Sequence, residues 1–188
     1  MKIEKIVFMG TPDFAVPTLN ALAKTRFKPQ LCITQPDRPK GRKRKLQPTP
    51  VKSAAQKLEI PVIQPEDVNS LETINELLEI SPDIIVTVAY GGYINKYLRL
   101  LPNFGCINLH PSLLPKYRGS APINYTLFNG EQITGNTIFK IVAKMDAGPV
   151  IFQSKVEIAE KDCYTSLYKK LSLSGAEEII KVLQNIEK

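Results

Sequence analysis

The chain has 188 residues, of which 43% are hydrophobic, and it carries 25 basic against 18 acidic residues, a net charge of +7. This length and apolar content suit one substantial core, so we predict a single domain over residues 1–188. No run approaches the roughly 18 apolar residues of a membrane span and the N-terminal segment lacks the apolar stretch of a secretory signal, so we expect a soluble, cytoplasmic protein with no membrane partner.

The first half of the chain alternates between strand-like and helix-like segments. An apolar run at residues 6–9 is followed by a Gly-Thr-Pro-Asp turn and then by apolar residues at helical spacing. Further strands are predicted at residues 31–34, 62–63 and 83–89, and helices at residues 51–58 and about 71–78. The run from Asp83 to Ala89 is rich in β-branched residues, which is typical of a strand buried on both faces of a parallel sheet. The pattern predicts an α/β fold with a doubly wound, mostly parallel sheet.

The second half predicts a strand at residues 106–109, a proline-rich loop at 110–122 and a helix that ends near residue 128. Strands at residues 136–142 and 150–156 and a closing helix at about 166–183 follow. Ligands of open α/β sheets bind beyond the carboxyl ends of the strands, so the loops that start at Gly10, Gln35, Tyr90 and His110 are predicted to border one site. The turn after the first strand has one glycine where a dinucleotide-binding fingerprint has three, which argues against a nucleotide cofactor.

Cysteine and histidine are too few for a disulfide framework or a zinc site. The three cysteines, Cys32, Cys106 and Cys163, lie far apart, and His110 is the only histidine. Cys32 and Cys106 fall in apolar strand-like runs and are predicted to be small core residues. No paired-cysteine motif exists, so we expect no metal site.

Two polar residues stand at the end of the strand that leads into the proline-rich loop. Side chains alternate along a strand, so Asn108 and His110 point to the same face and can approach one substrate atom. A lone histidine is often structural, but here the string NLHPSLLPKYRG continues to Gly119. This string resembles the folate-dependent formyltransferases. The resemblance implies a Rossmann-like formyltransferase fold and a catalytic group of Asn108, His110 and Asp146.

Formyl transfer explains why these residue types are needed. When an amine attacks the formyl group of 10-formyltetrahydrofolate, the tetrahedral intermediate carries an oxyanion that requires fixed donors, here Asn108 and His110. His110 can also move a proton near neutral pH, while Asp146 would orient it. The resemblance further implies folate contacts from eight residues: Val88, Ala89, Tyr90, Gly91, Ser112, Leu113, Leu114 and Pro115.

Six of the basic residues lie within eight positions, and the rest of the chain is nearly neutral, with 19 basic and 18 acidic residues. These six are Arg38, Lys40, Arg42, Lys43, Arg44 and Lys45. Such a segment suits a polyanion, although an isolated basic run is often only a solvated loop. It resembles the tRNA-contacting loop of methionyl-tRNA formyltransferases, which implies initiator methionyl-tRNA as substrate and a methionine pocket that includes Phe14.

Other functions stay open. The chain could formylate an amino-sugar nucleotide or glycinamide ribonucleotide, or it could be a truncated RNA-binding module without turnover. The tRNA enzymes usually continue into a small β-barrel domain, which is absent from these 188 residues. We expect the chain to be a monomer.

Overall fold

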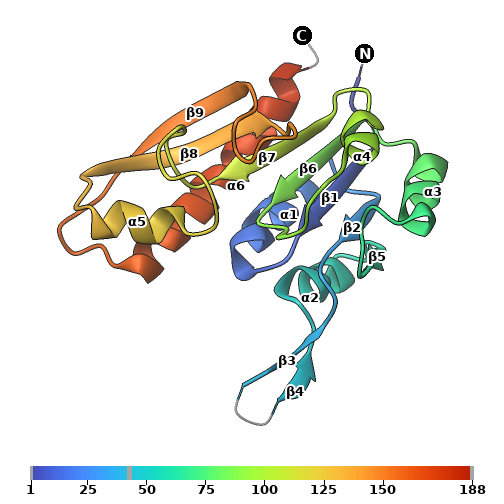
Figure 1. Cartoon of the computed structure of the whole chain (residues 1–188), viewed down its shortest axis with the longest axis horizontal. Coiled ribbons are helices and arrows are strands. Elements are labelled where there is room, and N and C mark those ends of the chain that lie inside the picture. Colours follow the sequence, from blue (N-terminus) through green and yellow to red (C-terminus); the bar gives the residue numbers. More distant parts are fainter. Residues whose placement is uncertain (1, 42–43, 187–188) are drawn as a thin grey trace.

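The computed structural model describes residues 2–41 and 44–186, and a seven-stranded sheet forms its centre (Figure 1). The strand order is β5-β2-β1-β6-β7-β8-β9. Five strands are parallel: β1 (Ile6–Gly10), β2 (Leu31–Ile33), β5 (Val62–Ile63), β6 (Ile84–Val88) and β7 (Cys106–His110). Two more, β8 (Ile133–Lys140) and β9 (Val150–Glu157), extend the sheet in antiparallel fashion. The predicted doubly wound, mostly parallel sheet is confirmed, and the strand order reverses between β1 and β6.

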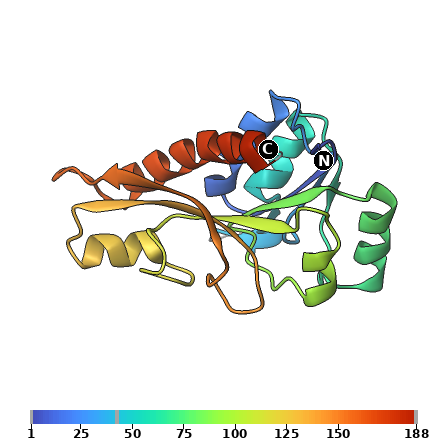
Figure 2. The same ribbon diagram turned by 90° about the horizontal axis from the view of Figure 1, so that it is seen from above.

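Helices cover both faces of the sheet (Figure 2). Helices α1 (Val16–Ala23), α2 (Pro50–Lys57) and α6 (Tyr164–Ile186) pack on one face, and α3 (Leu71–Ile80) and α4 (Lys96–Leu100) pack on the other. Side-chain alternation along β1 divides its residues between the two cores, with Phe8 facing the first group of helices and Met9 facing the second. Cys32 and Cys106 are buried in these cores, as predicted.

Three of the helices begin at a side chain that accepts a backbone hydrogen bond. Thr49 caps α2, Ser70 caps α3 and Asn95 caps α4, and each side chain satisfies one of the free N–H groups of the first turn. The sequence did not predict α4, because five residues are too few to show helical periodicity. Within the described residues, no helix is both long and apolar enough to cross a membrane.

The basic segment forms a β-hairpin that projects from the body of the domain (Figure 1). Strands β3 (Arg38–Lys40) and β4 (Lys45–Gln47) pair in antiparallel fashion, and the Arg44 N–H donates to the Gly41 carbonyl across the turn at 3.0 Å. The prediction of a loop was wrong here, because exposed strands need no alternation of apolar and polar residues. Arg42 and Lys43 lie outside the described residues.

One boundary matters for the site. The predicted strand at residues 136–142 is found at residues 133–140, so the chain leaves β8 two residues earlier than expected. A loop of residues 141–149 then leads to β9 and carries Asp146. Helix α5 (Pro122–Phe128) follows the proline-rich loop, close to its predicted position.

Candidate active site

A cavity of about 880 Å³ opens at the carboxyl ends of β1, β6 and β7. Its wall includes Pro12 after β1, Ala89 after β6, His110 at the end of β7 and the loop before β9. Ligands of open α/β sheets bind where the strand order reverses, and small-molecule sites commonly measure roughly 300–1,000 Å³. Three of the four predicted loops therefore border one site. The loop from Gln35 does not join the described wall, because the chain there turns into the β3–β4 hairpin.

Asn108 lies half-buried in the cavity wall, next to Thr87 of the neighbouring strand. The Thr87 hydroxyl donates to Asn108 Oδ1 at 2.7 Å and also lies 3.0 Å from the Ile107 carbonyl oxygen. Among the described residues, Asn108 Nδ2 has no hydrogen-bond partner. Its two N–H donors are therefore available to a ligand in the cavity, as oxyanion stabilisation requires.

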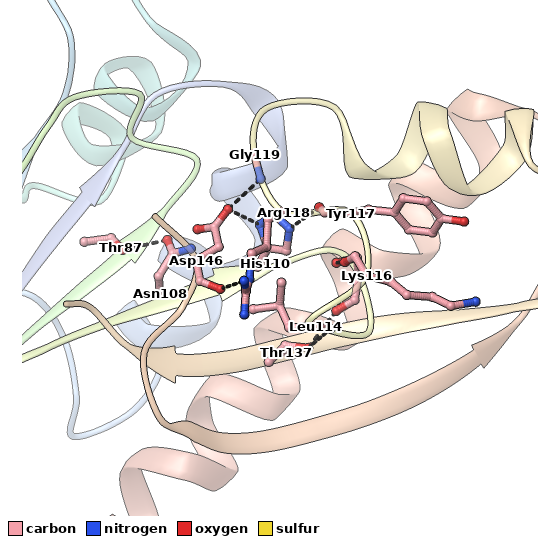
Figure 3. A network of polar contacts seen from close by, with 11 residues as sticks. Thr87, Asn108, His110, Leu114, Lys116, Tyr117, Arg118, Gly119, Thr137 and Asp146 are labelled. Carbon is pink, nitrogen blue, oxygen red and sulfur yellow. Dashed lines mark hydrogen bonds and ion pairs between the residues drawn. The ribbon is translucent and has the colours of Figure 1, made fainter. Parts of the chain in front are cut away.

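His110 is buried, and both ring nitrogens face acceptors (Figure 3). Nε2 lies 2.9 Å from the Tyr117 carbonyl oxygen, and a carbonyl only accepts, so this hydrogen bond requires a proton on Nε2. Nδ1 lies 3.7 Å from Asp146 Oδ2, which forms an ion pair when the imidazole is doubly protonated. In the part of the chain that the structure describes, no group of three or more acidic, histidine or cysteine side chains is placed to hold a metal ion.

Asp146 reaches His110 from a strained backbone position. Its φ is 46°, in the left-handed region that residues other than glycine, asparagine and aspartate rarely occupy. Two contacts from the facing loop hold it there (Figure 3): the Gly119 N–H donates to Asp146 Oδ2 at 2.8 Å, and Arg118 Nε donates to its carbonyl oxygen at 2.9 Å. Strain of this kind is typical of functional sites, where the surrounding structure holds it in place.

Gly148 allows the loop that carries Asp146 to fold back onto β8. A Cβ at this position would lie 1.7 Å from the Lys140 carbonyl oxygen, a distance that no side chain tolerates. The Lys140 N–H donates to the Pro149 carbonyl at 3.0 Å, which fixes the same approach. Glycine at position 148 thus sets the direction from which Asp146 enters the cavity.

Behind His110, the segment of residues 112–116 is tied to the sheet (Figure 3). Thr137 Oγ1 donates to the Ser112 carbonyl at 2.6 Å and accepts from the Leu114 N–H at 3.1 Å, while the Ser112 hydroxyl donates to the Lys116 carbonyl at 2.7 Å. These bonds shape the loop that presents the Tyr117 carbonyl to His110. The described wall of the cavity does not include Val88 or the predicted folate residues Ser112, Leu113, Leu114 and Pro115.

Residues 4–183 match the sequence model of the Formyl transferase family. The chain belongs to this family. It is 50% identical over 182 residues to a methionyl-tRNA formyltransferase of Kosmotoga olearia and 47% identical over 182 residues to one of Bacillus subtilis. Each alignment covers 97% of this chain but only 58% and 57% of the relative, so the chain spans less than three-fifths of the length of these relatives.

Solved structures of two phosphoribosylglycinamide formyltransferases share the fold. A phosphoribosylglycinamide formyltransferase of Bacillus halodurans superposes with a TM-score of 0.80 at 22% identity, covering 97% of this chain and 94% of that one. One from Streptococcus pneumoniae gives a TM-score of 0.81 at 17% identity, with 99% of both chains covered. At these identities the likeness establishes the architecture alone.

In this formyl transferase chain, the loop after β6 forms one wall of the cavity. Ala89, Tyr90 and Gly91 all border it, and Ala89 and Gly91 have left-handed backbones with φ of 47° and 82°. The Thr11 hydroxyl donates to the Tyr90 carbonyl at 2.8 Å, which ties this loop to the turn after β1. Burial raises the pKa of Tyr90 to about 12, so its phenol stays protonated.

An aromatic cluster closes another side of the cavity. Phe14 meets the edge of Tyr168 with ring centroids 5.1 Å apart, and Tyr164 lies 5.5 Å from Tyr168. All three border the cavity. Sequence reasoning singled out Phe14 but missed the two tyrosines, whose signal was aromatic residues at i and i+4 near the start of the closing helix.

The hairpin presents its described basic residues on an exposed surface. Arg38 pairs with Glu66 at 2.8 Å, with both side chains exposed, and Arg44 and Lys45 are exposed. Arg42 and Lys43, also predicted to contact tRNA, lie outside the described residues, and Lys40 is placed as part of β3. These basic side chains of the hairpin therefore lie on a projecting element and not in the described wall of the cavity.

Proposed function

We propose that this chain transfers a formyl group from 10-formyltetrahydrofolate to the α-amino group of initiator methionyl-tRNA, which gives formylmethionyl-tRNA and tetrahydrofolate. One observation carries this assignment: Asn108, His110 and Asp146, from a strand end and a distant loop, meet in the wall of one cavity. Relatives named methionyl-tRNA formyltransferase support the choice of substrate, as does the basic hairpin.

The reaction needs no nucleophilic side chain. An α-amino group has a pKa near 8 and is partly neutral at physiological pH, so its nitrogen can attack the formyl carbon directly. A new C–N bond forms, the carbonyl oxygen becomes an oxyanion, and the bond from the formyl carbon to N10 of the folate then breaks. One proton leaves the attacking nitrogen and one reaches N10, so the transfer balances without a further reactant.

The three polar residues divide these tasks. The free Nδ2 donors of Asn108 would stabilise the oxyanion, and they are fixed before the reaction begins. Because the Nε2 proton of His110 is engaged with the Tyr117 carbonyl, proton exchange with the substrate falls to Nδ1. Asp146 faces that atom and would stabilise the imidazolium form while keeping the ring oriented.

The cavity offers separate places for the two substrates. Backbone groups of the loop Ala89–Gly91 would pair with the flat heterocycle of the folate, and the loop that carries Asp146 lines the same cavity. The aromatic cluster of Phe14, Tyr164 and Tyr168 would receive the methionine side chain, since sulfur–aromatic contacts contribute about 0.3–1.5 kcal/mol. The tRNA would lie along the hairpin, where basic side chains meet phosphates.

A formyl-transfer assay with four acceptors in parallel tests the function. We expect transfer to methionyl-initiator-tRNA and none to uncharged tRNA, glycinamide ribonucleotide or an amino-sugar nucleotide. His110→Asn should nearly abolish turnover and retain the fold, which serves as the background control. Transfer to glycinamide ribonucleotide or the sugar nucleotide alone would show that the tRNA assignment is wrong, and no transfer to any acceptor would contradict the activity of this chain as a whole.

A further inference from the structure

We propose that Thr87 is a positioning residue for formyl transfer, and that its hydroxyl holds the Asn108 amide with its two N–H donors toward the reacting atoms. The inference rests on the proposed function, since it concerns the same oxyanion site. Thr87 and Asn108 are register partners on the parallel strands β6 and β7, and both border the cavity. The distance from Thr87 Oγ1 to Asn108 Oδ1 is 2.7 Å.

Asn108 needs such a partner because its side-chain amide has no strongly preferred orientation of its own. The terminal torsion of an asparagine is broad and roughly two-fold, so the amide can present either its nitrogen or its oxygen to the cavity. The oxygen would repel an oxyanion, whereas the nitrogen would stabilise it. A hydroxyl can also accept a hydrogen bond, but here the Thr87 hydroxyl donates to Oδ1, and this bond holds the productive orientation before the substrate arrives.

Burial makes Thr87 suited to this task. The residue is only 2% exposed, and a hydrogen bond in buried surroundings is stronger than one in solvent. The single hydroxyl proton has two acceptors, Asn108 Oδ1 at 2.7 Å and the Ile107 carbonyl at 3.0 Å, and the shorter contact is the one to the amide.

Two conservative variants distinguish a purely structural role of Thr87 from a positioning role, because the two roles predict opposite effects on turnover. Thr87→Val keeps the volume and the β-branched shape but loses the hydroxyl, so a purely structural role predicts nearly normal turnover of the folded protein. Thr87→Ser keeps the hydroxyl but loses a buried methyl group, so a structural role predicts the greater damage. A positioning role predicts that turnover follows the hydroxyl and not the packing.

We would measure kcat, KM for both substrates and the melting temperature of each variant. We expect Thr87→Val to lower kcat about threefold to tenfold, the worth of one neutral hydrogen bond, with KM for both substrates unchanged. We expect Thr87→Ser to keep kcat within about twofold of the parent although its melting temperature falls by roughly 2–4 °C. Loss of turnover that tracks the melting temperature in both variants would overturn the proposal.

Two further measurements test whether a loss of turnover in Thr87→Val arises from the contact between Thr87 and Asn108. In the Asn108→Ala background, Thr87→Val should have no additional effect on kcat, and multiplicative losses would contradict the coupling. Independently of activity, the side-chain amide of Asn108 should become more mobile in Thr87→Val by ¹⁵N relaxation and stay ordered in Thr87→Ser. If the parent chain formylates nothing, the proposed function fails, yet the amide measurement still decides for or against the role of Thr87.

Discussion

His110 Nδ1 and Asp146 Oδ2 face each other across 3.7 Å, although the two residues come from β7 and from the loop before β9. This is an ion-pair distance, longer than a normal hydrogen bond. Oδ2 already accepts from the Gly119 N–H at 2.8 Å, and His110 Nε2 is bonded to the Tyr117 carbonyl. The loop after β7 thus holds both members of the pair, so we predict that a change at Asp146 affects catalysis through charge more than through position.

Asp146→Asn tests that charge. Asparagine tolerates the left-handed backbone at this position and keeps an oxygen for the Gly119 N–H, so the loop should retain its shape. We expect kcat to fall on the order of a hundredfold, as for removal of one electrostatic interaction with a transition state, with little change in the KM for folate. Asp83→Asn, at the amino end of β6, is the control and should keep normal turnover. Near-normal turnover of Asp146→Asn would remove it from the catalytic group.

The elements predicted most accurately from the sequence are the strands that are buried on both faces of the sheet. The strands β1, β6 and β7 were found within one or two residues of their predicted bounds, because continuous apolar or β-branched runs have few alternatives in a parallel sheet. The hairpin β3–β4 and the short helix α4 were missed, since the first buries almost nothing and the second is too short for periodicity.

The residues of the candidate site also differ in how far the sequence alone could predict them. Alternation along a strand was enough to place Asn108 and His110 on one face, but only the family resemblance pointed to Asp146. Its approach depends on a left-handed φ and on the contact of Gly148 with β8, neither of which leaves a periodic signal. Thr87 was invisible because a threonine within a β-branched run looks like any other core residue.

The buried carboxyl of Glu178 predicts a pH-dependent contribution to stability. This buried carboxyl accepts from the Ser154 hydroxyl at 2.6 Å, and among the described residues neither its second oxygen nor the Asn136 amide oxygen has a hydrogen-bond partner. Burial raises the pKa of Glu178 in the folded state, so the stability it contributes is present below the unfolded pKa and is lost as the pH rises through the raised one.

We expect Glu178→Gln to remove this dependence, because glutamine keeps one donor and one acceptor at every pH. Urea unfolding between about pH 4.5 and 8 should show a free energy of unfolding that falls with pH in the parent relative to the variant. Carboxylates with lowered pKa, such as Asp162, lose their contribution as the pH falls and are common to both proteins. Parallel curves for parent and variant would show that the pKa of Glu178 is the same in the folded and unfolded states and would contradict this prediction.

Replacement of Arg42, Lys43, Arg44 and Lys45 by alanine tests the hairpin as an RNA-binding element. We expect a higher KM for methionyl-tRNA and a salt dependence whose log–log slope drops by roughly 0.7–0.9 for each phosphate that the hairpin no longer neutralises. The KM for folate should not move, because the hairpin does not line the described cavity. The matched control removes the same charge at four exposed lysines outside the hairpin: Lys28, Lys155, Lys161 and Lys169. Equal effects of the two variants would show that the hairpin attracts tRNA only through the net charge of the protein and does not contact it specifically.

The root of the hairpin shows how its direction is fixed. Both oxygens of Asp37 are engaged, one by Lys52 Nζ and the other by Gln64 Nε2, each at 2.6 Å. The hydroxyls of Thr34 and Thr49 lie 2.8 Å apart and join the two ends of the segment. Hydrogen bonds from Lys52 and then Gln64 lower the pKa of Asp37, so this carboxylate stays charged at physiological pH.

Asp37→Asn separates hairpin position from hairpin charge. The substitution makes the protein more positive by one unit, so attraction alone predicts a lower KM for methionyl-tRNA. If the root directs the basic residues, the KM should instead rise about threefold to tenfold, equivalent to about 0.7–1.4 kcal/mol, with kcat nearly unchanged. Glu66→Gln is the matched control, because it changes the charge equally beside Arg38 but leaves the root intact, and its KM should stay level or fall. A fall in KM for Asp37→Asn as large as that for Glu66→Gln would show that the hairpin acts by charge alone.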